Sequence, residues 1–302
     1  MDENIFERIL RKRKELDKLR PFNQGALKKL RETFNVELTY NSNAIEGNSL
    51  TLNETRLVLE EGITIGGKPL KEHLEVTNHQ KAIEFVEMLV KKPKVEEIDV
   101  LNIHALILDR IDPQNAGFYR NCAVRITGTT YFPPNPVKVP NLIQEVYSLL
   151  NSKPGEPIET AAMIHLKFVN IHPFVDGNGR TARLLLNLYL MRHGYPPVII
   201  LRAERKKYIN SLVLAQMKND YQSFIDFIAK AVERSLDIYL DCLGTNPKEY
   251  FSLAEASKHS KYSMEYLSLL ARTGKIEAVK FGRNWKITKE AIEEYEKEHG
   301  GK

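Results

Sequence analysis

Cysteine is scarce in this sequence, because only Cys122 and Cys242 occur among 302 residues. They lie far apart and form neither a disulfide framework nor a CxxC metal motif, so we expect two buried, unpaired thiols. Long apolar runs are also missing, and none approaches the roughly eighteen residues of a membrane-crossing helix. The charged N-terminal segment lacks the apolar core of a signal peptide. These absences predict a cytoplasmic protein without a membrane partner.

An excess of charge is missing as well. The formal net charge is +5, the charged fraction is 27% and the apolar fraction is 42%, as in soluble globular proteins. A charge this small is compatible with anionic ligands such as nucleotides but does not identify nucleic acid as a partner. The length favours one sizeable domain with a smaller one.

Strand patterns are rare in the first 240 residues, where apolar residues recur mostly at helical spacing. The sequence therefore predicts a mainly α main domain. Capping boxes at Thr51–Glu54 and Ser252–Glu255 mark two helix starts, and Gly62 is placed to end the first helix. One stretch, 123–132, is rich in β-branched and aromatic residues around Gly128, which predicts a β-hairpin.

A polar cluster, HPFVDGNGR at 172–180, interrupts two apolar segments. The segment before it, 158–171, has apolar residues at helical spacing, and Pro173 ends this pattern. The segment after it, 181–193, is leucine-rich on nearly every face, which predicts a helix in the centre of the core. The cluster should therefore lie at the N-terminus of a buried helix.

A helix start offers unpaired N–H groups and positive potential, and glycines allow a ligand to approach the backbone. We expect Gly177, Asn178 and Gly179 to direct N–H groups at a phosphate, with Arg180 and Arg183 adding two cations on one helix face. Such a site suits a polyphosphate.

His172 and Asp176 add chemistry to this anion site. His172 is the one group in the cluster that titrates near neutrality, so we interpret it as a general base. Asp176 is a hard oxygen ligand that could hold Mg²⁺ together with phosphate oxygens. The predicted chemistry is attack on phosphorus by a protein hydroxyl group.

Two other interpretations of the cluster are weaker. Gly177 and Gly179 with Ala182 imitate a dinucleotide fingerprint, but no strand precedes them and no βαβ unit surrounds them. His165 and His172 could together bind a transition metal, yet His165 lies in the apolar stripe and is better explained as a core histidine.

Residues 172–183, HPFVDGNGRTAR, resemble the signature of Fic-domain adenylyltransferases, HPFx(D/E)GNGRxxR, without a departure. The resemblance covers about residues 35–235 and implies a Fic-type helical fold that transfers AMP from ATP to a Ser, Thr or Tyr hydroxyl group of a target protein, releasing pyrophosphate. It implies that His172 is the base and that Asp176 holds Mg²⁺ or Mn²⁺. Arg180 would contact phosphates and Arg183 the γ-phosphate. The implied nucleotide-binding set is Gly177, Asn178, Gly179, Arg180, Thr181, Ala182 and Arg183.

Two further stretches are interpreted through the same resemblance. The hairpin residues Gly128, Thr129, Thr130 and Tyr131 resemble the Fic flap, which would bind the target segment by strand addition; a purely structural hairpin is the alternative. Tyr208 and Gln216, on a helix expected over 204–219, are weaker candidates for contacts to adenine, because an aromatic residue at helical spacing is more often part of the core.

Ser42-Asn-Ala-Ile-Glu46-Gly47 matches the inhibitory motif (S/T)xxxE(G/N) of Fic proteins. We expect a short helix over 36–46, ended by Gly47, with Ser42 and Glu46 on one face. The resemblance implies that Glu46 pairs with Arg183 and takes the place of the γ-phosphate, so that the protein restrains itself. Some relatives with such a glutamate also remove AMP, so this reverse activity is left open.

The last residues favour a separate small module after the turn-prone 243–247. The order helix, helix, hairpin, helix over 252–298 resembles excisionase-like winged-helix modules. Seven Lys or Arg residues against Glu265 and Glu277 give residues 258–286 a local charge of +5, which suits duplex DNA, although such modules also bind proteins or dimerise.

The predicted architecture is therefore a mainly α Fic core with a small C-terminal winged-helix (α+β) module. We expect an N-terminal helical region at 1–100 that contains the inhibitory helix at about 36–47, a catalytic core at 101–243 and the winged-helix module at 248–302. The predicted function is regulated AMP transfer to a target protein and to the chain itself, with homodimerisation left open. Transfer of phosphocholine, phosphate or UMP, as in some relatives, is one alternative. A DNA-binding regulator that uses its Fic core as a nucleotide sensor is the other.

Overall fold

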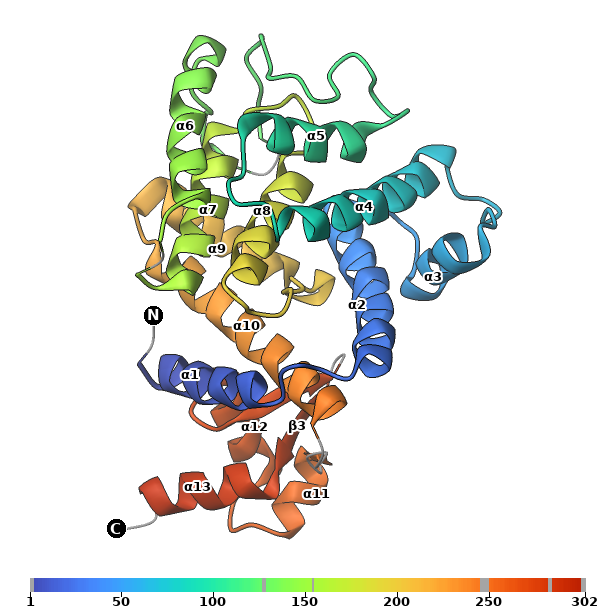
Figure 1. Cartoon of the computed structure of the whole chain (residues 1–302). Coiled ribbons are helices and arrows are strands. Elements are labelled where there is room, and N and C mark those ends of the chain that lie inside the picture. Colours follow the sequence, from blue (N-terminus) through green and yellow to red (C-terminus); the bar gives the residue numbers. More distant parts are fainter. Residues whose placement is uncertain (1–2, 127–128, 154, 245–249, 282–283, 300–302) are drawn as a thin grey trace. The chain divides into compact units, whose positions relative to one another are not determined.

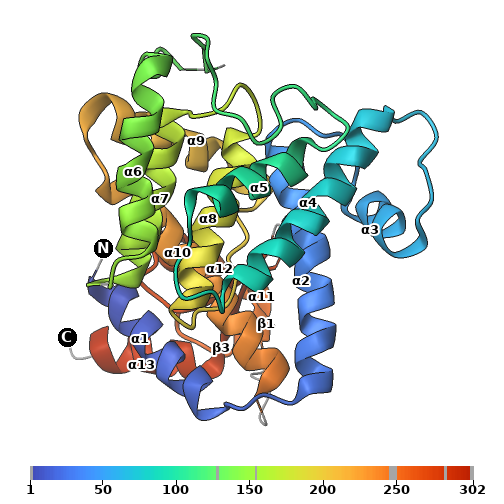
Figure 2. The same cartoon turned by 45° about the horizontal axis from the view of Figure 1, so that its top comes forward.

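The structure is a computed structural model that describes residues 3–126, 129–153, 155–244, 250–281 and 284–299, and it is mainly helical (Figures 1 and 2). In chain order its elements are α1 (Glu3–Lys18), α2 (Gln24–Ile45), α3 (Leu52–Glu61), α4 (Leu70–Leu89), α5 (Glu97–Leu108), η1 (Pro136–Lys138), α6 (Val139–Leu150), α7 (Pro157–Ile171), α8 (Asn178–Arg192), η2 (Arg202–Glu204), α9 (Arg205–Lys218), α10 (Gln222–Leu243), β1 (Tyr250–Ser252), α11 (Leu253–Lys258), α12 (Met264–Thr273), β2 (Ala278–Phe281), β3 (Asn284–Thr288) and α13 (Lys289–His299).

The chain divides into two compact units. Residues 28–232 form the first unit, and residues 2–27 form the second together with 233–302. Helices α2 and α10 run from one unit into the other. The division into functional domains at 1–100, 101–243 and 248–302 stays a prediction, and the compact units differ from it in placing α1 with the C-terminal residues.

The predicted buried helix, α8, forms the centre of the first unit. It packs against α7, α4 and α5 (Figure 1), and every residue from Arg180 to Leu190 is buried. The predicted stripe on α7 is buried as well, including Ile158, Ile164 and Ile171. A helix that is buried on all sides needs a core around it, and this position fixes the 172–180 loop at its N-terminus.

Local signals placed several helix ends correctly. The Thr51 capping box begins α3, and Gly62 ends it in the left-handed conformation at φ 67°. The helix predicted over 36–46 is longer than expected, because α2 begins at Gln24 rather than near 36. Asn23 caps its first turn, because Asn23 Oδ1 accepts from the Ala26 N–H at 3.0 Å, a local signal that the prediction overlooked. The buried residues of the early turns, among them Leu27, Leu30 and Phe34, add tertiary packing to this cap.

The predicted β-hairpin at 123–132 is wrong for the part of it that the structure describes. None of the residues 123–126 and 129–132 belongs to a strand, and Gly128 lies outside the described residues. The Tyr131 N–H donates locally to Thr129 Oγ1 at 3.1 Å, which competes with pairing across a hairpin. An isolated two-stranded hairpin is marginal in water, so this segment, which we call the flap segment, has no ladder there.

The prediction of buried thiols was also wrong, because Cys122 and Cys242 are both exposed and unpaired. Cys122 immediately precedes the flap segment and Cys242 lies in the last turn of α10, and neither position belongs to a packed face. Within the described ranges, no helix has both the length and the apolar content that a bilayer crossing requires.

The second unit contains the predicted order of helix, helix, hairpin and helix in α11, α12, β2–β3 and α13. It adds a strand that was not predicted: β1 pairs antiparallel with β3, so that the sheet order is β1-β3-β2. Its core includes Leu267, Leu270, Ile287 and Ile292. The Ser252 capping box begins α11 as expected. Assignment of this module to the winged-helix class stays a prediction.

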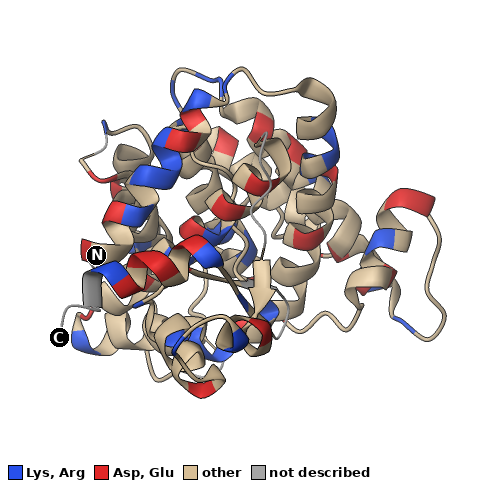
Figure 3. Ribbon diagram, turned by 90° about the horizontal axis from the view of Figure 1, so that it is seen from below, with Lys and Arg blue, Asp and Glu red and all other residues tan. Residues whose placement is uncertain are grey.

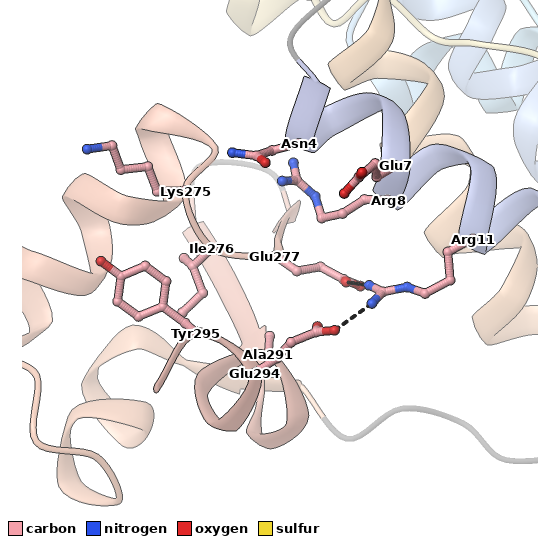
Figure 4. Close-up of a pocket in the computed structure, with 10 residues that line it drawn as sticks. All are labelled: Asn4, Glu7, Arg8, Arg11, Lys275, Ile276, Glu277, Ala291, Glu294 and Tyr295. Carbon is pink, nitrogen blue, oxygen red and sulfur yellow. Dashed lines mark hydrogen bonds and ion pairs between the residues drawn. The ribbon is translucent and has the colours of Figure 1, made fainter. Parts of the chain in front are cut away.

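Helix α1 is part of this second unit through a buried ionic cluster. Lys12 Nζ is 1% exposed and lies 3.0 Å from Glu233 Oε1, 2.8 Å from Asp237 Oδ1 and 3.1 Å from Glu277 Oε1. Arg11 pairs with Glu277 and Glu294 across a cavity of about 410 Å³ between α1 and the module (Figure 4). Charges from both chain ends therefore compensate one another inside one unit.

Candidate active site

His172 follows α7 directly and has a left-handed backbone, with φ 49°. A non-glycine residue adopts this conformation only when its surroundings hold it there. Arg120 supplies that hold: its Nε donates to His172 O at 2.7 Å, and its backbone N–H donates to Pro173 O at 2.9 Å. The turn therefore points the imidazole away from the helix axis and into the cavity described below.

Burial and, to a lesser extent, the positive charge of Arg120 lower the pKa of His172 to about 4. The Val169 backbone and the carboxylates of Glu46 and Asp176 oppose this shift. The imidazole is consequently neutral at pH 7, which is the form that accepts a proton.

Asn178 and His104 fix the loop between His172 and α8. The Asn178 amide accepts from Phe174 N at 3.0 Å and donates to Phe174 O at 2.9 Å. The His104 ring stacks on Phe174 with a centroid distance of 3.6 Å. Because Gly117 N–H donates to His104 Nδ1, the Nε2 atom carries the hydrogen that bonds to Asp176 O. The loop is therefore preorganised by buried groups.

The loop places the start of α8 at the cavity. Gly177 caps the helix with φ 75°, and its N–H donates to Asp176 Oδ1 at 2.6 Å. A methyl group added at Gly179 would lie 2.3 Å from Glu46 Oε1. A carboxylate thus already approaches the backbone at this point, and the same lack of a side chain would admit phosphate oxygens.

Arg180 and Arg183 both line the cavity, and each is only 3% exposed. The carboxylate oxygens nearest to Arg180 belong to Glu75 and Asp176, both at 3.6 Å. Within the described residues, Nε and Nη1 of Arg180 have no hydrogen-bond partner. This buried guanidinium group therefore has no close ionic partner and can still bind an anionic ligand.

The predicted contact of Glu46 with Arg183 is confirmed. Arg183 Nη2 donates to Glu46 Oε1 at 2.8 Å and to Ser42 O at 2.9 Å, while Nε donates to Ser42 Oγ at 3.0 Å. Burial lowers the pKa of Arg183, but Glu46 and Tyr208 together outweigh burial and raise the pKa overall. Both residues of the predicted inhibitory motif therefore meet the second arginine of the loop.

These groups enclose a cavity of about 510 Å³. The structure brings the predicted residues His172, Asp176, Gly177, Asn178, Gly179, Arg180, Arg183, Glu46, Thr129, Tyr208 and Gln216 to its lining. Thr181 and Ala182 do not line it. Both are fully buried, and the Thr181 hydroxyl donates to Gly177 O at 3.0 Å inside the helix. Of the other flap residues, Thr130 is exposed and the Tyr131 hydroxyl donates to Asn170 O.

Tyr208 and Gln216 lie on α9 but differ in their surroundings. Tyr208 is 2% exposed, and its hydroxyl group is 2.9 Å from His165 Nε2. Gln216 donates from Nε2 to Asn170 Oδ1 at 3.0 Å. Tyr208 is therefore mainly a core residue with one edge at the cavity, and His165 is a core histidine as expected.

Sequence reasoning missed several residues that build the site. The sequence analysis assigned no role to Arg120, and His104 lies in a plain apolar helix that gives no signal. Arg125 of the flap segment and Arg205 of α9 also line the cavity. Contacts that join distant segments, such as these, have no local pattern by which they could be found.

Comparison with known proteins agrees with this geometry. The model of the Fic/DOC family matches residues 94–190. The structure of Fic-1 from C. elegans is 36% identical and superimposes with a TM-score of 0.71, covering 80% of this chain and 72% of that one. The chain belongs to the Fic/DOC family. A Fic domain containing signaling protein from Bacteroides thetaiotaomicron VPI-5482 is 28% identical, with a TM-score of 0.72 over 78% of this chain and 96% of that chain.

The "Protein adenylyltransferase Fic" of Drosophila melanogaster is also similar, with 38% identity over 253 residues. That match covers 82% of this Fic/DOC chain and 51% of the fly protein. The chain thus spans about half the length of the curated relatives that it matches.

Proposed function

We propose that this chain transfers AMP from ATP to a Ser, Thr or Tyr hydroxyl group of a target protein. The observation that carries the proposal is the segment 172–183, which consists of the loop and the first turns of α8. This segment brings a neutral His172, the N-terminus of α8 and two buried guanidinium groups to one cavity. Relatives named protein adenylyltransferase support the reaction type.

In the proposed mechanism, α8 and Arg180 bind the polyphosphate and orient the α-phosphate beside His172. The target hydroxyl oxygen attacks the α-phosphorus, and the bond from this phosphorus to the bridging oxygen of the β-phosphate breaks. Pyrophosphate leaves, while His172 takes the hydroxyl proton. The cavity side of α9, with Ile209, Leu212 and Val213, offers an apolar surface for the base of the nucleotide.

Asp176 is the residue that would hold Mg²⁺. Its side chain is 56% exposed, and no cluster of three or more potential metal ligands occurs within the described residues. A single carboxylate beside an anion site fits a magnesium ion that takes its remaining ligands from phosphate oxygens and water. When bound, the ion would neutralise phosphate charge.

Glu46 would restrain this activity. Its carboxylate occupies the N-terminus of α8 and pairs with Arg183, the position that we assign to the γ-phosphate. ATP bound beside it would lack that contact and adopt an unproductive pose. The same carboxylate is placed to orient a water molecule, so removal of AMP by this site is a second activity to be assayed.

Incubation with α-labelled ATP tests the proposed function. We expect weak labelling of protein by the unaltered chain, stronger labelling by Glu46→Gly, and none by Glu46→Gly combined with His172→Ala. ATP binding by the double variant, measured by calorimetry, separates lost chemistry from lost binding. Absence of label with Glu46→Gly protein that binds ATP would refute the proposal.

We propose two kinds of partner for the C-terminal module: duplex DNA, or a protein, which includes a second copy of the chain. Acidic residues stand among the basic ones in the view of Figure 3. The exposed residues of α12 include Met264, Glu265 and Leu269, but also the cation Arg272. This mixed surface is compatible with either partner. Retention on duplex DNA that falls steeply with salt would support DNA binding.

A further inference from the structure

The last turn of α2 has an unusual set of partners. An α-helix leaves its last four carbonyl groups without helical donors, and in α2 these belong to Ser42, Asn43, Ala44 and Ile45. The turn itself satisfies two of them, because Asn43 O accepts from Glu46 N and Asn48 N, and Ala44 O accepts from Gly47 N. The other two depend on arginine side chains from elsewhere in the first unit.

Both arginines line the cavity, but they contact different carbonyl groups of this turn. Arg183 donates to Ser42 O at 2.9 Å, and Arg205 Nε donates to Ile45 O at 2.7 Å. Arg205 begins α9, the helix whose residues line the cavity. A guanidinium at a helix C-terminus also interacts favourably with the helix dipole.

A second contact joins the same two segments. The backbone N–H of Arg202, in the 3₁₀ turn before α9, donates to Asn41 Oδ1 at 2.8 Å. Arg183 would turn to the γ-phosphate when ATP binds productively. Arg205 would then be the side chain that still holds the carbonyl next to Glu46.

We propose that Arg205 is a positioning residue that holds the end of α2, and with it Glu46, in the inhibitory place. The inference rests on the proposed AMP transfer and names a regulatory contact of the same site. Loss of this contact should release Glu46 more often without removing a group that performs the chemistry.

The test compares Arg205→Ala with Lys206→Ala. Lys206 is a neighbouring exposed cation, and its side chain has neither a hydrogen bond nor an ion pair within the described part of the chain. We expect Arg205→Ala to raise the kcat of AMP transfer about two- to tenfold, the range of one hydrogen bond, with the KM for ATP unchanged. Arg205→Lys, which can still donate one hydrogen bond, should fall between, and Lys206→Ala should have no effect. In the Glu46→Gly background, Arg205→Ala should add nothing.

Other outcomes would overturn the inference. An unchanged or lower kcat would show that Arg205 does not hold Glu46 in the inhibitory place. A higher KM for ATP in both backgrounds would show that Arg205 contacts the nucleotide instead. An equal rise in both backgrounds would show that it acts independently of Glu46.

A second measurement decides the inference if Glu46→Gly transfers no AMP and the proposed function fails. The amides of Glu46, Gly47 and Asn48 should then exchange hydrogen faster in Arg205→Ala than in Lys206→Ala, by a similar factor. Equal exchange in the two variants would refute the role of Arg205.

Discussion

The two buried arginines of the loop differ in how their charge is balanced. Arg183 has Glu46 Oε1 at 2.8 Å, whereas the carboxylates nearest to Arg180 are 3.6 Å away. Burial of an ion costs several kcal/mol unless close partners compensate it. Arg180 can therefore bind an anionic ligand while Glu46 is in place, whereas Arg183 would have to exchange its contact with Glu46 for one with the ligand.

The lowered pKa of His172 gives a pH prediction. Because its pKa is about 4, the imidazole is neutral throughout the range from pH 5.5 to 8, taken as about 1.5 units or more above that value. Glu46 raises this pKa, so Glu46→Gly should lower it further. We expect kcat/KM for AMP transfer by Glu46→Gly to show no inflection from His172 in this range.

Initial rates in buffers of constant ionic strength would measure the profile, and pyrophosphate release would serve as a second readout. An acid limb with a midpoint near pH 6.5, the value of an exposed histidine, would contradict the buried environment of His172.

The loop from His172 to Asn178 depends on side chains that bond to its backbone. Asn178 is 2% exposed and satisfies both the N–H and the C=O of Phe174. The resemblance to Fic proteins assigns Asn178 to nucleotide binding, and its geometry adds a structural role, since the amide keeps the segment before α8 folded back on itself.

Replacing Asn178 with alanine should therefore reduce stability as well as binding. It leaves two buried backbone groups without partners, at about 1–3 kcal/mol each, so we expect the free energy of unfolding in urea to fall by about 2–6 kcal/mol. Asn178→Asp keeps the acceptor for Phe174 N and should lose roughly half as much. A loss of ATP affinity with unchanged stability would instead assign Asn178 to the ligand alone.

Elements with strong local signals could be predicted, whereas those made by distant contacts could not. The apolar pattern of α7 and α8 and the Thr51 capping box each agree with the structure. Ser42 and Glu46 were found because their motif is compact. The strand β1 and the support of His172 by Arg120 were missed, because each depends on segments far away in the sequence. The start of α2 was missed although a local signal, the cap residue Asn23, marks it. The flap segment was predicted as strands from its composition, which cannot show whether a pairing partner exists.

The two compact units bury different kinds of titratable group. The first unit buries neutral histidines: burial lowers the pKa of His79 and His165 to about 3, and that of His104 and His172 to about 4. The second unit buries Lys12 among three carboxylates. There burial, together with Glu277 and Glu233, raises the pKa of Asp237, while Lys12 and Arg8 lower the pKa of Glu233.

This difference predicts that acid affects the two units unequally. Unfolded histidines take up protons below about pH 6.5, whereas the folded ones do not until about pH 4 or 3. Each therefore removes up to about 1.4 kcal/mol of stability per pH unit as the pH falls through that window. Asp237 has the opposite sign: its raised pKa lets the folded state bind a proton first, so its contribution to stability rises as the pH falls from neutrality. Glu233 has a lowered pKa in the folded state, so it reduces stability only when the pH falls below about 4.5, the pKa of this group in the unfolded chain.

Urea unfolding at pH 7 and pH 5 would measure the difference. Trp285, the single tryptophan, lies in β3 and reports on the second unit, and far-UV circular dichroism follows mainly the helices of the first. We expect the urea concentration at the midpoint of the dichroism transition to be lower at pH 5 than at pH 7, while the midpoint of the Trp285 transition moves less or rises.

Lys12→Met is the matched variant. It leaves three carboxylates facing one another, so the free energy of unfolding reported by Trp285 should fall by about 3–5 kcal/mol at pH 7. Part of this loss should be recovered at pH 5, because a carboxylate is then protonated. Parallel shifts of both probes in the unaltered protein, or a pH-independent loss in Lys12→Met, would show that these buried charges do not set the acid response.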